Sequence, residues 1–388
     1  MSRGHIRRQG KSSWELKFDL GIDPTTGRRQ TRYATFRGTK REAETELTRL
    51  LKYADDGSHV EVSRETLADF AEYWLTAVAP IKAKSAKTLE RYRELIDGHI
   101  VPHLGTTLLQ KLQGSQIDAF YSHLRVAGRK NGKGGLSKQT IIHIHRRLSA
   151  LLSAAVKAGK IRTNPMERTL ARPASQATDR REIRVLDSDE RVTLLEELSG
   201  TPYYMPTLVC LGTGLRRGEI LGLKWEDVNF DAGTLTVDRS LRETKAGLSL
   251  EVPKTKHSRR MIKLPTTLVN ALQTHRRKQA EYYVRTGLRS DLDLVFPNEL
   301  GSLKAPDDFS WKFGQAVKKT GLSGVSFHSL RHTHITDLLR NGKSIKAIAT
   351  RAGHKDPTVT LQIYAHVMPG DDDDLAEVAD ETLRSITG

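Results

Sequence analysis

The spacing of the apolar residues changes near Ser63, and this change constrains the fold more than any other feature of the chain. Before it, apolar and polar residues alternate from Trp14 to Leu20, which is the period-two pattern of a half-buried strand. After it, apolar residues from Leu67 onward recur at three- and four-residue steps, as on one face of a helix. We therefore expect an α+β protein whose 388 residues form two or three domains.

A small sheet followed by a helix is predicted at the N-terminus. A second strand is expected over Gln30–Phe36, and the turn-forming residues 23–27 join the two strands as a hairpin within a small sheet of two or three strands. Thr39 and Glu42 have the spacing of a capping box. A helix should begin there and run to about Tyr53.

The predicted sheet carries a concentrated positive charge. Residues 1–41 contain eleven Arg or Lys and three acidic residues. Such a field suits a sheet face that enters a DNA groove, because each cationic side chain can neutralise a phosphate. The candidate DNA contacts here are Arg28, Arg29 and Arg32.

Four helical stretches are expected next and form an all-α domain. The last three run near Ser85–Ile100, Ser115–Leu124 and Ser137–Ala158, and a serine that can cap the N-terminus opens each of them. The basic loop 128–135 joins the last two helices and has two interpretations, a phosphate contact or an ordinary solvated loop. Its candidate DNA contacts are Arg129, Lys130 and Lys133.

A polar stretch over residues 173–184 has no apolar period and predicts a linker. The chain beyond it mixes helices with short strands, so we expect a mainly helical domain with a small antiparallel sheet. Its predicted strands are residues 234–237, 248–252 and 261–264, and the predicted domains are residues 1–60, 63–172 and 185–388. The stretch after Asp371 is acid-rich, would repel DNA and should face protein instead.

The composition favours a polyanionic partner inside the cell. Lys and Arg number 63 against 46 Asp and Glu, a formal charge of +17, which favours nucleic acid over the alternative of a merely basic soluble protein. Cys210 is the only cysteine, so no disulfide or thiolate zinc site is expected within one chain. Without a long apolar run or a secretory signal, we expect a cytoplasmic protein that associates with the bacterial nucleoid when bound to DNA.

Five chemically reactive elements follow one another in the C-terminal half. The segment Gly212–Ile220 should end one helix at its glycines and begin another, which projects Arg216 from a sharp turn. The other four are the hairpin segment Pro253–Lys256, the His328-x-x-Arg331 motif, Gly353-His354, and Tyr364.

These residue types suit chemistry at a phosphodiester. Arg216 and Arg331 are permanently charged forks that can hold the non-bridging oxygens in paired hydrogen bonds. Tyr364 is a weak nucleophile while its phenol keeps a pKa of about 10, so it needs a cationic site and a base nearby. His328 and His354 can supply hydrogen bonds and proton transfer.

Each element alone also fits an ordinary structural role. A lone arginine after glycine is commonly solvated, and a lone tyrosine on an apolar stretch is commonly half-buried core. His328 and His332 stand four residues apart, as metal ligands on one helix face do. However, no carboxylate lies between them and Arg331 would repel the metal. The evidence for a reactive site therefore comes from the occurrence of all five elements together in this order.

In this order the elements resemble the active-site set of the tyrosine site-specific recombinases, in particular the phage-type integrases. The resemblance covers the catalytic half, and the two segments ahead of it resemble the arm-binding and core-binding domains of that family. It implies that Tyr364 is the nucleophile and that the reactive cluster comprises Arg216, His328, Arg331 and His354.

The resemblance gives the role of general acid to the hairpin lysine, which would protonate the leaving 5′-oxygen. That lysine is Lys254, and Lys256 is the competing candidate because it lies on the same strand face two residues on. Two residues depart from the family pattern. Lys263 stands where the family often has proline, and Arg217 adds a second arginine beside Arg216. Neither departure removes a reactive group, but they leave open which side chains hold the phosphate.

The activity implied is integration and excision of a mobile element, without cofactor, metal or ATP, through a 3′-phosphotyrosyl intermediate and a Holliday junction. Implied partners are double-stranded DNA at core and arm sites, further copies in a homotetramer, and host DNA-bending and excision proteins. Alternatives are a type IB topoisomerase, a recombinase that resolves chromosome dimers, and an inactive DNA-binding regulator. The arm-like N-terminal segment argues against the first two, and the complete reactive set argues against the third.

Overall fold

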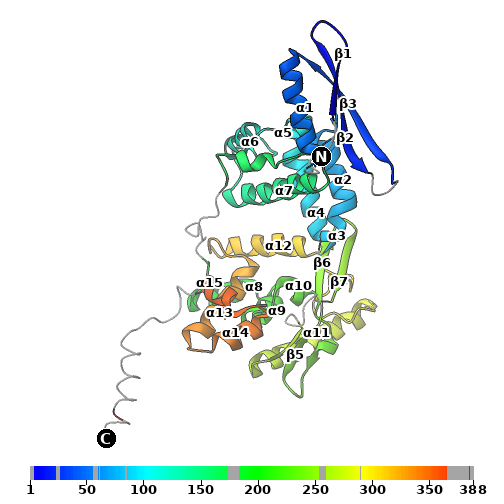
Figure 1. Ribbon diagram of the computed structural model, residues 1–388. Helices are drawn as coiled ribbons and strands as arrows, with labels where there is room; N and C mark the ends of the chain where they lie inside the picture. The colour runs from blue at the N-terminus through cyan, green and yellow to red at the C-terminus, as the bar shows by residue number, and fades with distance from the viewer. Residues whose placement is uncertain are drawn as a thin grey trace. The chain divides into compact units, whose positions relative to one another are not determined.

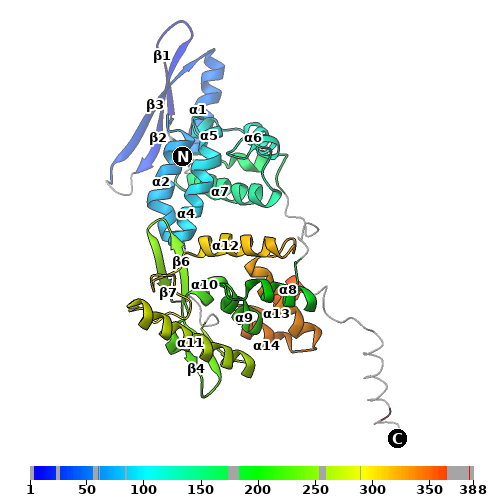
Figure 2. The same ribbon diagram turned by 180° about the vertical axis from the view of Figure 1, so that it is seen from behind.

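The chain forms two compact units, Met1–Asp179 and Arg180–Gly388, and the division falls inside the linker range expected at 173–184. A computed structural model describes residues 4–22, 27–55, 60, 62–83, 85–173, 183–252, 259–288, 290–364 and 384. Each unit contains its own hydrophobic core. Figures 1 and 2 show the helices and strands of both units from opposite sides. No helix in the described ranges is both long enough and apolar enough to cross a membrane.

The N-terminal sheet has three antiparallel strands in the order β1-β2-β3, with helix α1 packed against it (Figure 1). Their bounds are β1 Gly4–Arg8, β2 Ser13–Ile22, β3 Arg29–Arg37 and α1 Lys40–Asp55. Leu16 and Phe18 are buried on the α1 side, as the alternating pattern predicted. The expected capping box is confirmed, because Thr39 N–H donates to Glu42 Oε2 at 2.7 Å and Glu42 N–H donates to Thr39 Oγ1 at 3.3 Å. Of the turn 23–27, only Gly27 is among the described residues.

Four helical rods follow, and the first two each contain one wider π-type turn. Their segments are α2 Leu67–Tyr73, the π turn Trp74–Val78 and α3 Ala79–Lys82; α4 Ala86–Leu95, the π turn Ile96–Ile100 and α5 Val101–Leu104; α6 Gly114–Ala127; and α7 Lys138–Lys157. Ser85 and Ser137 cap α4 and α7 as predicted. The prediction for Ser115 is wrong, because α6 begins one residue earlier and Gln113 exchanges the capping bonds with Gln116.

In its described residues the second unit is mainly helical with two small antiparallel sheets. Its helices are α8 Ser188–Leu198, α9 Tyr204–Thr213, α10 Arg217–Leu221, α11 Thr266–Thr286, α12 Pro306–Lys319, α13 Phe327–Arg340, α14 Ile345–Ala352 and α15 Pro357–Tyr364. Its strands are β4 Val228–Asn229, β5 Thr234–Val237, β6 Ser240–Thr244, β7 Gly247–Glu251 and β8 Arg260–Lys263. The three predicted strands are confirmed to within one residue at each end.

The strand pairing corrects the expected hairpin around residues 253–256. Strand β7 pairs with β6, whereas β8 pairs with β5 in the sheet β4-β5-β8. The two strands that flank the segment therefore belong to different sheets and do not pair with each other, while residues 253–258 themselves lie outside the described residues. Sequence spacing could not distinguish these cases, because β6 was not expected and it takes β7 as its own partner.

Candidate active site

The turn between α9 and α10 presents Arg216. Helix α9 ends at Gly214, whose φ of +70° is left-handed and suits glycine, and Arg216 then begins α10 in extended conformation. This confirms the sharp turn predicted from the sequence. The Arg216 guanidinium donates to Glu219 Oε1 at 2.9 Å and to the Gly353 carbonyl at 2.8 Å, and 39% of the side chain stays exposed.

Arg331 lies on α13 and is almost fully buried, with 2% of the residue exposed. Its guanidinium donates to the Gly214 carbonyl at 2.5 Å, to the Ala352 carbonyl at 2.8 Å and to His354 Nε2 at 2.9 Å. It thereby ties the α9–α10 turn to the end of α14. Burial and the neighbouring Arg216 charge lower the pKa of Arg331 to about 10, so it still carries its charge at neutral pH.

His354 follows α14 and uses both ring nitrogens inside the protein. Nε2 accepts from Arg331, and Nδ1 lies 2.8 Å from Thr360 Oγ1, an arrangement that fits a neutral ring with its proton on Nδ1. Burial, followed by the charges of Arg331 and Arg216, lowers the pKa of His354 to about 4. In this arrangement His354 orients the Arg331 guanidinium.

Tyr364 is the last residue of α15, and 2% of it is exposed. Its ring packs with Ile335, Leu339 and Ile348. Its hydroxyl lies 2.5 Å from Nδ1 of His332 on α13. Burial raises the pKa of the Tyr364 phenol, and the Arg331 charge opposes that shift. The sequence interpretation did not assign His332 to the site, although it lies next to Arg331.

His328 stands one turn before His332 on α13, and their rings meet edge to face with centroids 4.5 Å apart. Burial, then the charges of Arg331 and Arg216, lowers the pKa of His328. Both histidines are therefore neutral at physiological pH. The α13 helix and the segment after α14 thus bring Arg331, His328, His332 and His354 to one place, and the α9–α10 turn adds Arg216.

A buried ion pair supports this cluster and was not expected from the sequence. Glu219 on α10 and Arg260 on β8 each have 4% of their side chain exposed, and they bond at 2.9 Å and 3.2 Å. Burial alone would raise the pKa of the Glu219 carboxyl, but Arg260 and Arg216 lower it. Glu219 therefore remains an anion that holds two guanidinium groups, and one of them is Arg216.

Three predictions near the site lie outside the described residues. Lys254 and Lys256 both fall within 253–258, and the acid-rich stretch after Asp371 lies outside the described residues as well, apart from Arg384. Of the two departures, Lys263 lies on β8 and its ammonium donates to the Ala232 carbonyl. Arg217 donates to Asp307 at 3.1 Å and to Ser310 at 2.6 Å on α12. Arg217 thus contributes to packing in the described structure, whereas Arg216 faces the cluster.

The N-terminal DNA candidates lie at different places on the sheet. Arg28 is exposed just before β3, Arg29 pairs with Asp19, and Arg32 stands opposite Phe18 on the side that α1 covers. The other face presents Lys17 opposite Tyr33, with the ammonium 5.8 Å from the ring centroid. Alternation also places on this open face Arg7, which pairs with Glu15, and Arg37, which pairs with Ser13.

In the helical part of the same unit, Lys130 belongs to a cationic surface. A Cβ added to Gly98 would meet its ammonium at 2.6 Å. Besides burial, the charges of Lys130 and Arg91 lower the pKa of His99. Arg146 and Arg91 add to the burial that lowers the pKa of His143. By contrast, Arg129 folds back to the Gly135 carbonyl at 3.0 Å, and Lys133 is exposed on the loop.

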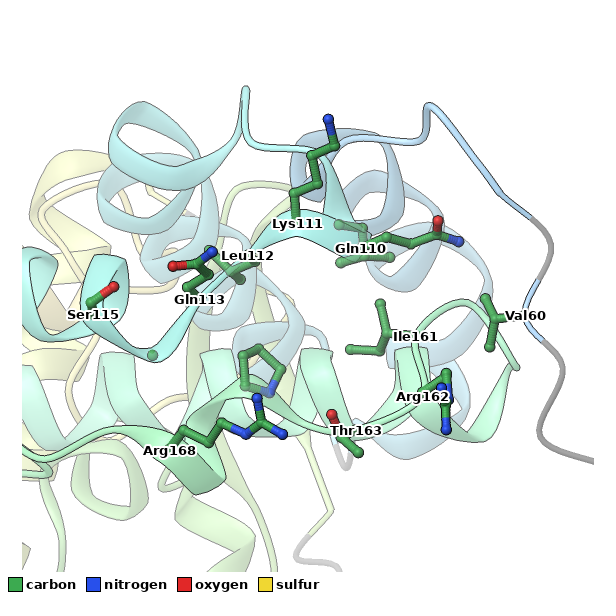
Figure 3. Close-up of a pocket in the computed structure, with 13 residues that line it drawn as sticks. Val60, Gln110, Lys111, Leu112, Gln113, Ser115, Ile161, Arg162, Thr163 and Arg168 are labelled. Atoms are coloured by element: carbon green, nitrogen blue, oxygen red, sulfur yellow. The ribbon is translucent and has the colours of Figure 1, made fainter. Parts of the chain in front are cut away.

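A hollow of about 760 Å³ lies in the same unit, beside the start of α6 (Figure 3). Lys111, Arg162 and Arg168 stand around it, together with Gln113 and Ser115. It contains none of the reactive side chains, which all belong to the second unit. The candidate reactive residues lie instead on the α9–α10 turn, on α13, just after α14 and on α15.

Comparisons with known proteins show which family the chain resembles over both units. The profile of the Phage integrase family matches residues 184–370, and the Phage integrase N-terminal SAM-like domain matches residues 66–125. A "Tyrosine recombinase XerC-like" protein of Caldanaerobacter subterraneus is 27% identical, over 93% of this chain and 94% of its own length. The ICEBs1 integrase of Bacillus subtilis is 24% identical, over 97% of this chain and all of its own length.

The fold of a solved structure is similar as well. The Tn1549 transposon integrase in complex with a circular intermediate DNA matches with a TM-score of 0.66 and 23% identity, over 82% of this chain and 99% of that chain. Fold, reactive cluster and family profiles together define the class, and the chain belongs to the phage integrase family. It is a site-specific tyrosine recombinase of the integrase type.

Proposed function

We propose that the protein integrates and excises a mobile DNA element, with Tyr364 as the nucleophile that forms a 3′-phosphotyrosyl bond. One observation supports this most. The Tyr364 hydroxyl lies beside the neutral His332 and near the buried Arg331 guanidinium of the same chain. Arg331 in turn bonds to the turn that presents Arg216. An oxygen nucleophile and two permanent cations are the groups that phosphodiester transfer needs.

In the proposed step the Tyr364 oxygen attacks the scissile phosphorus and the 5′-oxygen of the DNA departs. Negative charge grows on the non-bridging oxygens, and Arg216 and Arg331 stabilise it with forked hydrogen bonds. His354 keeps the Arg331 fork oriented, and Glu219 does the same for Arg216. His328 adds a hydrogen bond or proton transfer at the phosphate, and Lys254 protonates the leaving 5′-oxygen, with Lys256 as the alternative.

The phosphotyrosyl bond conserves the energy of the broken phosphodiester, so a 5′-hydroxyl from a second duplex can attack it and reseal the strand. Two such exchanges pass through a Holliday junction. Each exchange uses two tyrosines, which are set free again when the strands reseal, and two duplexes present four strands. A homotetramer on DNA is therefore the assembly that supplies one active site to each strand.

Two cationic surfaces of the first unit support a division of the DNA sites between its two parts. Residues 1–60 would bind arm sites through the open sheet face that carries Lys17 and Tyr33, and residues 63–172 would bind core sites through the surface around Arg91 and Lys130. Residues 173–184 would link them to the catalytic domain 185–388. Host DNA-bending and excision proteins would complete the assembly.

A nicked suicide substrate that carries the core site tests the function. The cleaved strand loses a short fragment, so the reverse reaction fails and the covalent protein–DNA adduct accumulates. The wild-type chain should form this adduct without metal or ATP. Tyr364→Phe should bind the same DNA and form none, because only the nucleophilic oxygen is lost. A covalent adduct with this variant, or none with the wild type, would refute the proposal.

A further inference from the structure

His332 contacts the atom that has to react. Its Nδ1 lies 2.5 Å from the Tyr364 hydroxyl, and the two rings are inclined by 55° with centroids 5.5 Å apart. The groups around it are His328 on its own helix, Arg331 beside it, His354 after α14 and Tyr364 on α15. Each of these neighbours is cationic or neutral, so among the described residues no anion beside His332 favours its protonated form.

The other candidate bases of the cluster are differently engaged. Both nitrogens of His354 bond within the protein, one to Arg331 and the other to Thr360. Glu219 accepts from Arg216 and Arg260. His328 meets the ring of His332, and among the described residues no hydrogen bond joins it to Tyr364. The contact therefore singles out one imidazole nitrogen.

We infer that His332 is a further catalytic residue whose Nδ1 takes the phenolic proton of Tyr364 as the tyrosine oxygen attacks the scissile phosphorus. The inference rests on the proposed function. The oxygen–phosphorus bond forms, the bond to the 5′-oxygen breaks, and the proton moves from the phenol to Nδ1. In the reverse step the imidazolium returns that proton to the departing tyrosine oxygen. The 5′-oxygen receives its proton from the separate general acid.

The surroundings keep the proton on the phenol in the resting site and leave the imidazole unprotonated. Burial, with the charges of His328 and Arg331, lowers the pKa of His332 to about 4, so the ring is free to accept a proton at neutral pH. Burial raises the pKa of the Tyr364 phenol, so the tyrosine does not ionise without help. The Arg331 charge favours the phenolate as it forms. The proton thus leaves the phenol only when the phosphate is in place to take its electrons.

Two substitutions separate proton transfer from mere positioning. Asparagine carries its amide oxygen at the δ position, so His332→Asn keeps an acceptor near the Nδ1 site but cannot bind a proton at neutral pH. His332→Ala removes both functions. We expect both variants to form the covalent adduct on the nicked core substrate at least about 100-fold more slowly than the wild type. Their rates should rise steadily with pH, because hydroxide then replaces the base.

A chemical rescue and a matched control complete the experiment. Replacement of Tyr364 by a fluorinated tyrosine lowers the phenol pKa, and should restore His332→Ala far more than it changes the wild type. His334→Asn is the control. His334 lies two residues on, is also buried and bonds to Leu211 and Arg351 instead of the tyrosine. It should keep the wild-type pH profile even if its stability drops.

The outcomes are distinct. A wild-type rate and pH profile in His332→Asn, with loss only in His332→Ala, would show a positioning role and overturn the inference. Absence of rescue by the fluorinated tyrosine would overturn it as well. Failure of the wild-type chain itself to form the adduct would instead reject the proposed function. Circular dichroism and core-DNA binding of each variant identify a loss that comes from misfolding.

Discussion

The cationic groups of the two units differ in how they meet water. Around Tyr364, Arg331 is 2% exposed and donates to two backbone carbonyls and a histidine. On the N-terminal strands the cations lie in solvent, and Arg29 keeps 69% of its side chain exposed beside Asp19. The effect of a buried guanidinium depends on where its hydrogen bonds point. The effect of solvated cations depends mainly on how many there are, and salt screens it. The cleavage rate in the second unit should therefore be sensitive to the geometry of the cationic side chains. DNA binding by the first unit should be sensitive to the salt concentration.

After loss of the Tyr364 nucleophile itself, the largest effect is expected where a proton must reach the leaving group. Lys254→Ala should slow cleavage about 100- to 10,000-fold, because the 5′-oxygen is a poor leaving group without a general acid. A substrate with sulfur in place of the bridging 5′-oxygen needs little protonation. It should rescue Lys254→Ala but leave Arg216→Ala slow in the suicide-substrate assay. Rescue of Lys256→Ala in place of Lys254→Ala would assign the acid to the other lysine.

Exchange of arginine for lysine tests the comparison directly. Arg331→Lys and Arg216→Lys should each raise the cleavage barrier by about 2–4 kcal/mol, since a point charge replaces an oriented fork. Arg7→Lys on the open sheet face keeps the charge and should leave arm-DNA affinity nearly unchanged. Cleavage rates and gel shifts measure the two effects. Near-normal cleavage in both site variants would place the phosphate clamp elsewhere.

Removal of the N-terminal domain should separate binding from chemistry. Deletion of residues 1 to about 60 removes the basic sheet but leaves the helical rods and Tyr364 in place. Core cleavage should survive, while arm-DNA binding collapses and integration between full sites fails. In the intact chain, arm binding should weaken steeply with salt, by close to one counterion for each phosphate neutralised. A flat salt dependence would contradict an electrostatic contact.

Acid should weaken the catalytic unit through its neutral histidines. The pKa values of His332, His334 and His354 are lowered to about 4, from about 6.5 when unfolded. As pH falls from 6.5 towards 4, these histidines become protonated in the unfolded chain but stay neutral in the folded chain. The free energy of unfolding therefore decreases across this window. Each histidine should lower the free energy of unfolding by on the order of 1 kcal/mol at pH 5.

Hydrogen exchange measured by mass spectrometry checks this, with α1 as the reference. Protection of α13 should fall between pH 7.5 and pH 5 after correction for the intrinsic exchange rate. Equal protection of α13 at both pH values would mean that protonation of the three histidines does not lower the free energy of unfolding.

The smallest effect on DNA affinity is expected at the C-terminus. Removal of the chain after Pro369 deletes an acid-rich stretch that suits a neighbouring protomer better than a phosphate backbone. Tetramer assembly on core DNA, followed by crosslinking, should suffer more than binding of one protomer in gel shifts. Weaker monomer binding with normal tetramers would contradict the assignment of this stretch to protein contacts.

The amino-acid sequence determined the features that depend on neighbours along the chain. Alternation predicted β2 and β3, the Thr39–Glu42 spacing predicted the start of α1, and the glycines before Arg216 predicted the break between α9 and α10. Motif order also brought together the candidate residues Arg216, Arg331, His354 and Tyr364. Local hydrogen bonds and side-chain periodicity act over a few residues, so such features can be predicted from spacing alone.

Tertiary structure decided the relations between distant segments. The partner of Tyr364 is His332, 32 residues away, and Glu219 meets Arg260 across 41 residues. Likewise, β7 pairs with β6 and β8 pairs with β5, so the two strands on either side of residues 253–258 are not partners. These contacts arise because helices and strands pack their apolar faces together, and that packing fixes which polar side chains meet. No spacing rule contains this information, since it depends on the shape of the whole core.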